Sequence, residues 1–183
     1  MELNRRDTSN RGTKCLRYFI ALFLFLSGTI NLQSCSYSFT GASVPTHLKT
    51  ISIPVFSDKS GSGELDLNRR LTNQLTQRFI DDNTLLVSDR INSDSMLEGT
   101  IVTLSDAPAV VSGGEKVTSR RITVTVRAVY KDLVKKQTVF DRSFSNYADY
   151  VVGGDITSVR KSAIDSAIKR IAEDILLGVV SNW

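Results

Sequence analysis

The clearest pattern along the chain is an alternation of apolar and polar residues from Arg121 to Tyr130. Ile122, Val124, Val126, Ala128 and Tyr130 share one face, and the other face is mostly polar. Because successive side chains of a strand point to opposite sides of the sheet, this alternation predicts a half-buried antiparallel strand. Other apolar patterns predict further strands over residues 48–56, 97–104 and 137–151, and the short apolar run at residues 85–87 allows one extra strand.

Two segments carry apolar residues at helical spacing. The first, from about residue 64 to residue 82, has an apolar residue at every fourth position: Leu67, Leu71, Leu75 and Phe79. The second has a broad apolar face between Ile156 and Leu176, which predicts a last helix capped by Asp155 or Thr157. Gly178 is expected to weaken the end of that helix.

The order of these elements defines the expected fold class. The first strand is followed by a helix, then by the short and long strands, and then by the last helix. A helix connection allows the first strand to lie parallel to a neighbour, whereas hairpins make the later strands antiparallel. We therefore predict an α+β two-layer sandwich, in which a mixed sheet of about four strands has two helices packed on one face. Gly113-Gly114 is expected at a hairpin tip, and Pro54, without an N–H, at an edge or a strand end.

The first 34 residues have the pattern of a secretory signal peptide. A cationic stretch precedes an unbroken apolar run over residues 19–26. A membrane-spanning helix needs about 20 apolar residues, so this run is too short to span a bilayer and fits the apolar core of a signal.

Cys35 is the strongest single candidate for covalent modification. The stretch Leu32-Gln33-Ser34-Cys35 resembles the lipobox of bacterial lipoproteins, although Gln33 departs from the usual small or apolar residue. That resemblance implies a diacylglycerol on the Cys35 thiol, cleavage after Ser34 and acylation of the new amino terminus. Residues 35–47 would then form a lipidated tether and residues 48–183 the folded domain. An ordinary signal peptide with a chance cysteine, or an uncleaved anchor, remains the alternative.

Charge and composition exclude several classes of function for the mature chain. The net charge is +4, but without residues 1–34 there remain 18 cationic and 17 anionic residues, which gives no case for binding nucleic acid. No cysteine follows Cys35, so a disulfide framework or a cysteine zinc site is excluded there. The only histidine, His47, has no accompanying nucleophile motif and is expected at the surface or in a turn. We expect no catalytic residues, metal or cofactor.

Four cations at expected strand ends are candidates for binding phosphate groups of lipids. They are Arg120, Arg121, Lys135 and Lys136. Solvated charges at turns are the competing interpretation.

The residues after Cys35 resemble a known family. Tyr37-Ser38-Phe39-Thr40-Gly41, the strand ending in Pro54-Val55-Phe56, and a helix with Asn68, Arg69 and Leu71 are similar to the start of the lipopolysaccharide-assembly lipoprotein family (LptE), in the form found in Bacteroidetes. The order of elements is also similar as far as the C-terminus.

This resemblance implies a role in transport, without enzymatic activity. Family members lie at the periplasmic face of the outer membrane, where they plug and help to assemble a large β-barrel, the LptD-type subunit, through which lipopolysaccharide (LPS) is delivered. Ser36 after the cysteine agrees with passage to the outer membrane. Arg120, Arg121, Lys135 and Lys136 are the candidate LPS contacts. Another envelope lipoprotein, such as a secretin pilot or a glycan-binding module, is the alternative.

Overall fold

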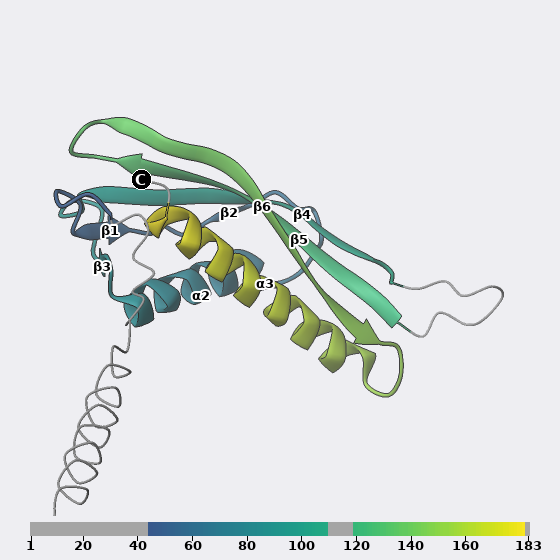
Figure 1. The fold of residues 1–183 in the computed structure, drawn as a ribbon. Coiled ribbons are helices and arrows are strands. Elements are labelled where there is room, and N and C mark those ends of the chain that lie inside the picture. Colours follow the sequence, from purple (N-terminus) through teal and green to yellow (C-terminus); the bar gives the residue numbers. More distant parts are fainter. Residues whose placement is uncertain (1–43, 110–118, 182–183) are drawn as a thin grey trace, which may run out of the picture. The chain divides into compact units, whose positions relative to one another are not determined.

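The computed structural model describes residues 44–109 and 119–181 (Figure 1). Its strands are β1 Thr50–Ser52, β2 Ser57–Asp58, β3 Leu86–Val87, β4 Ser95–Pro108, β5 Ser119–Asp132 and β6 Gln137–Val151. Its helices are α2 Leu67–Asp82 and α3 Ile156–Val180. The predicted α+β class is confirmed. The predicted signal peptide, Cys35, most of the predicted tether and the hairpin tip predicted at Gly113-Gly114 lie outside the described residues.

One mixed sheet contains all the described strands, in the order β3-β1-β4-β5-β6, with β2 also paired to β4. The short strands make the parallel pairs β1/β3, β1/β4 and β2/β4. The long strands β4, β5 and β6 form an antiparallel meander, as expected. The sheet has six strands, so the prediction of about four strands was slightly low.

The strand predicted over residues 48–56 is shorter in the structure, where only β1 lies within that range, and the additional strand β2 follows it. Pro54 follows the end of β1 and has no N–H to donate to a ladder. The N–H of Phe56 donates instead to Thr72 Oγ1 of α2, at 3.0 Å. The chain therefore leaves the sheet after Ser52 and pairs with β4 again only at Ser57.

The core lies between the sheet and the two helices, which cover the same face (Figure 1). The apolar face of β5 is fully buried against them, as the alternation predicted. From the helices, the core receives the predicted four-residue stripe of α2 and the isoleucines of α3: Leu67, Leu71, Leu75, Phe79, Ile164, Ile168, Ile171 and Ile175. Neither helix has the combination of length and apolar character that a membrane-spanning helix needs among the described residues.

The ends of the helices differ in part from expectation. α3 begins after Asp155, whose carboxylate accepts the N–H groups of Thr157 and Ser158, so the predicted cap is confirmed. Gly178 does not end α3, which continues to Val180. A side chain at Gly178 would meet Arg142 and Phe144 of β6, so the glycine allows the helix to approach the strand closely.

Candidate functional site

The outer face of the sheet, which no helix covers, is polar along β5 and β6. Thr123 and Thr125 of β5 and Ser143 and Ser145 of β6 present hydroxyl groups there, and Thr125 Oγ1 lies 3.1 Å from Ser145 Oγ. The register places these residues on the side opposite Val124, Val126 and the other core residues. We call this surface, formed by the outward side chains of β4, β5 and β6, the outer face.

The charges of the outer face are paired with one another. Arg121 makes a two-pronged bond to Asp149, at 2.6 and 2.8 Å, and Arg127 makes one to Asp141, at 2.7 and 2.6 Å. Lys131 pairs with Glu98. Each arginine holds the pKa of its aspartate below the ordinary value by direct hydrogen bonding. The face is therefore polar but close to neutral.

A second polar cluster lies at the end of the sheet where β5 begins and α3 starts. Asp106 of β4 accepts bonds from Arg120 Nε at 2.8 Å, from the Tyr150 hydroxyl at 2.8 Å and from Arg160 Nε at 3.1 Å. Arg160 also binds Glu64, at 2.9 Å. The cluster therefore joins three strands, helix α3 and the loop before α2.

A hollow of about 480 Å³ opens beside this cluster. Its lining combines polar and apolar side chains: Asp106, Arg120, Tyr150, Val152, Ile156, Thr157 and Arg160. Burial alone would raise the pKa of Asp106, but the bonds from Arg120, Tyr150 and Arg160 outweigh burial and lower it. Asp106 therefore stays ionised and holds two guanidinium groups at the rim of a partly apolar hollow.

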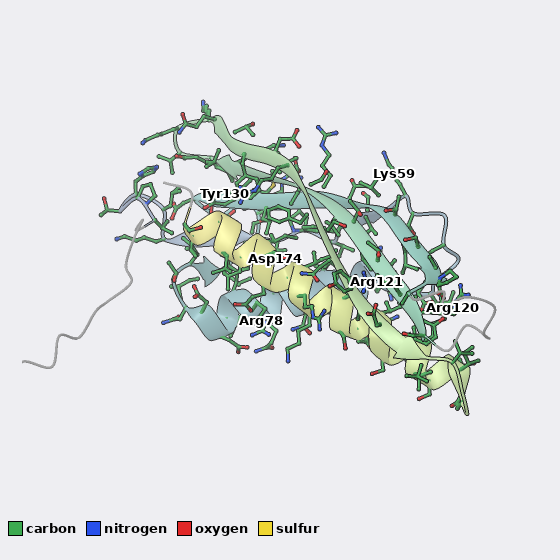
Figure 2. The ribbon with its side chains drawn as sticks, turned by 45° about the vertical axis from the view of Figure 1, so that its right-hand side comes forward. Lys59, Arg78, Arg120, Arg121, Tyr130 and Asp174 are labelled. Carbon is green, nitrogen blue, oxygen red and sulfur yellow. The ribbon has the colours of Figure 1, made fainter. Side chains whose placement is uncertain are left out.

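The four predicted cations do not form one site. Arg120 points to the helix side of the sheet and lines the hollow, whereas its neighbour Arg121 lies on the outer face and stacks on Tyr147, with 3.8 Å between Cζ and the ring centre. Figure 2 shows both arginines at the end of the sheet remote from Tyr130. Lys135 and Lys136 lie in the turn between β5 and β6, at the opposite end of β5.

Sequence reasoning missed the partners that give Arg120 its surroundings. Asp106 and Arg160 are 54 residues apart and had no motif in common. His47 lies in a turn, as predicted, but its partner Asp132 was also unforeseen. Contacts between residues so distant in the chain are set by the sheet register and by the packing of α3, which no local pattern encodes.

The described residues bring together a polar sheet face, an ionic cluster and a partly apolar hollow, an arrangement that suits a binding or assembly domain. The family comparison is specific: the model of the LptE family, described as lipopolysaccharide-assembly, matches residues 48–177, and the chain belongs to this family. No curated protein sequence matches the chain.

Solved structures share the fold at low sequence identity. A hypothetical protein from Chlamydia trachomatis has a TM-score of 0.56 and 9% identity, over 72% of this chain and 95% of that one. A minor lipoprotein from Acinetobacter baumannii has a TM-score of 0.51 and 14% identity, over 74% and 94% of the two chains. An uncharacterized lipoprotein B from Nitrosomonas europaea has a TM-score of 0.51 and 12% identity, over 79% and 88%. These similarities establish the fold.

Proposed function

We propose that this protein is an outer-membrane lipoprotein of the lipopolysaccharide translocon, anchored at the periplasmic face through acyl chains on Cys35. Its partner is an LptD-type β-barrel, which it plugs and helps to assemble. Family membership over residues 48–177 supports the assembly role, and the lipobox-like stretch before Cys35 supports the anchor. Two or more acyl chains would hold the protein stably at a membrane, where one chain is marginal.

The outer face is the observation that carries the barrel partnership. Wide membrane barrels have polar interiors. A sheet surface with hydroxyl groups and internally neutralised charges can lie against such a wall without burying an unpaired charge. Each guanidinium of the two paired arginines is held in one orientation by two bonds to a carboxylate.

The hollow beside Asp106 is the proposed LPS contact. Arg120 and Arg160 each have guanidinium N–H groups beyond those bonded to Asp106 and Glu64, and these groups can bind phosphate, while Val152 and Ile156 supply apolar surface. Arg120 is therefore the leading candidate of the four predicted cations. Arg121 lies on the other side of the sheet, beside Asp149 and Tyr147, and so does not face the hollow. Lys135 and Lys136 are too distant to share the same LPS group.

Co-purification with a large outer-membrane barrel, after mild detergent extraction, tests this function. The wild-type protein should recover the barrel. Thr125→Trp, which adds a bulky ring at the centre of the outer face, should reduce recovery several-fold, whereas Ser162→Trp on the exposed side of α3 should not. Recovery of the wild-type lipoprotein free of any barrel would count against the translocon and favour another envelope lipoprotein.

A further inference from the structure

The first described residues are fixed to the turn between β5 and β6 by a buried carboxylate. His47 Nε2 lies 2.7 Å from Asp132 Oδ2, and Asp132 is 1% exposed. The other oxygen of Asp132 accepts the N–H of Lys135 at 2.8 Å. The point at which the chain joins the fold is therefore held beside residues 133–136.

A second aspartate brings a further loop to the same place. Asp94 Oδ2 accepts the N–H groups of Lys49 and Thr50, at 2.9 and 3.1 Å, and the Thr50 hydroxyl bonds to the carbonyl of Asn92 at 3.4 Å. The N–H of Leu133 donates to the carbonyl of Asp94 at 2.8 Å. Residues 45–50, 88–94 and 133–136 therefore converge at one end of the sheet.

This convergence exposes apolar side chains among cations. Ile91 is 92% exposed and Val134 is 56% exposed, although both are β-branched apolar residues. Four exposed cations lie in the same three segments: Lys49, Arg90, Lys135 and Lys136. We call these six residues the tether-end surface.

The cations of the tether-end surface differ from four arginines elsewhere in the fold. Arg120, Arg121, Arg127 and Arg160 are each bonded to a carboxylate. By contrast, the side chains of Lys49, Arg90, Lys135 and Lys136 form no ion pair or hydrogen bond with other residues in the described ranges.

The nearby carboxylates are turned toward partners within the protein. Asp94 and Asp132 are bonded as described, and Asp89 accepts the backbone and side-chain N–H groups of Asn92, at 3.0 to 3.1 Å. Asp81 and Asp82, at the end of α2, accept bonds from Gln77 and from the N–H of Thr84. Lys49 helps to lower the pKa of Asp94 through its charge, but the side chains of Lys49 and Asp94 form no ion pair at contact distance. The cations of the tether-end surface therefore remain available to an external anion.

We propose that the tether-end surface docks on the headgroups of an anionic phospholipid leaflet. The proposal rests on the proposed lipidation of Cys35, because the stretch from Cys35 to Val44 spans at most about 30 Å and so keeps this end of the domain near the anchoring bilayer. The lysines and Arg90 pair with phosphates, and Ile91 and Val134 enter the boundary between headgroups and acyl chains. The tether limits the distance between the domain and the bilayer, and the tether-end surface sets the orientation of the domain.

Docking in this way places the hollow beside Asp106 away from the leaflet. β5 runs from Ser119, next to Arg120, to Asp132, next to the tether-end surface. At about 3.4 Å per residue, the two ends of the strand are roughly 40 Å apart. The hollow is therefore held well away from the anchoring leaflet, where a ligand arriving from the aqueous side can reach it.

Single-cysteine labelling of the lipidated protein tests the orientation. The chain after Cys35 has no other cysteine, and acylation protects Cys35 itself. Val134→Cys and Gly153→Cys, the latter at an open position beside the hollow, would each carry a fluorophore on protein bound to vesicles of phosphatidylethanolamine and phosphatidylglycerol. We expect a quencher attached to the lipid headgroups to act at least threefold more strongly at position 134 than at position 153.

Charge substitutions on the tether-end surface test its contact with lipid, and an equal change of charge on α3 is the matched control. Lys49→Glu with Lys135→Glu should reduce quenching at position 134 at least twofold, and so should replacement of phosphatidylglycerol by phosphatidylcholine. Lys161→Glu with Lys169→Glu, which changes the net charge equally on exposed positions of α3, should leave quenching unchanged.

The possible failures are distinguishable. If the wild-type protein does not float with the vesicles, the Cys35 anchor is wrong and the docking proposal fails with it. If the protein floats but positions 134 and 153 are quenched equally, the anchor stands and the docking surface is wrong. Quenching at position 134 that requires added LPS would overturn the phospholipid assignment in favour of an LPS-binding surface.

Discussion

His47 and Asp132, 85 residues apart in sequence, are joined by a 2.7 Å contact between the imidazole Nε2 and a buried carboxylate oxygen. Burial would raise the pKa of Asp132, but bonds from His47 and from the N–H of Lys135 outweigh burial and lower the pKa below its ordinary value. The carboxylate therefore stabilises the fold while it is ionised. The contact joins His47, the last residue of the predicted tether, to Asp132 at the end of β5, beside the turn between β5 and β6.

Asp132→Asn should lower the free energy of unfolding by about 1–3 kcal/mol at pH 7, because a buried group loses charge-assisted bonds. A lowered pKa in the folded state contributes stability above the unfolded pKa, and this contribution is lost as the pH falls through the folded pKa. The difference in the free energy of unfolding between wild type and Asp132→Asn, measured by urea titration, should therefore become smaller from pH 5 to pH 3. Asp81→Asn, at an exposed position, is the control. If Asp132→Asn lowered the free energy of unfolding equally at pH 7 and pH 3, the ionised Asp132 carboxylate would not be the stabilising group.

The proposed LPS contact predicts a difference between two arginines. Arg120→Gln should weaken LPS binding about tenfold, since a charge-assisted bond contributes roughly 1.5–3 kcal/mol. Arg127→Gln removes an equal charge from the outer face and should change the affinity little. Equilibrium binding of LPS to the purified variants gives the comparison, and equal affinities would remove Arg120 from the site.

Two glycines should respond differently to substitution by alanine. A Cβ at Gly99 would lie 2.5 Å from Phe56 Cε2 and 2.6 Å from the backbone oxygen of Arg127, which cannot move without disturbing the sheet. Gly99→Ala should therefore cost about 1–3 kcal/mol of stability.

At Gly178, by contrast, the nearest group is the flexible end of Arg142, and alanine favours the helix by about 1 kcal/mol. Gly178→Ala should therefore be much less destabilising than Gly99→Ala in thermal or urea unfolding. A larger loss at Gly178 would show that Phe144 and Arg142 cannot adjust.

The proposed acylation of Cys35 can be tested separately. Mass spectrometry of the native N-terminus should find Cys35 as the first residue and carrying acyl chains. Cys35→Ser should abolish this modification and move the protein from the membrane fraction to the soluble fraction. An unmodified residue 35 in the native protein would refute the lipoprotein assignment.

The long strands and helices could be predicted from the sequence because the apolar residues in each of them recur several times at one regular spacing. The alternation around Val124 and Val126 and the four-residue stripe of α2 identified both the elements and their buried faces. The short strands could not be predicted in the same way, since β1, β2 and β3 have only two or three residues each. Their pairing depends on distant contacts such as Phe56 with Thr72.

The candidate site was predictable only as a set of residue types. Arg120 and Arg121 are neighbours in sequence, and only the sheet register places them on opposite faces, with Asp106 and Asp149 as their respective partners. The exposure of Ile91 and Val134 also could not be predicted, because an isolated apolar residue in a loop belongs to no periodic pattern.

Depletion of the protein in its native bacterium, followed by measurement of LPS at the cell surface and of the folded outer-membrane barrel, tests the proposed role in LPS assembly. Surface LPS and correctly assembled barrel should both fall, and expression of the wild-type chain should restore both. Normal surface LPS after complete depletion would contradict the proposed role in LPS assembly.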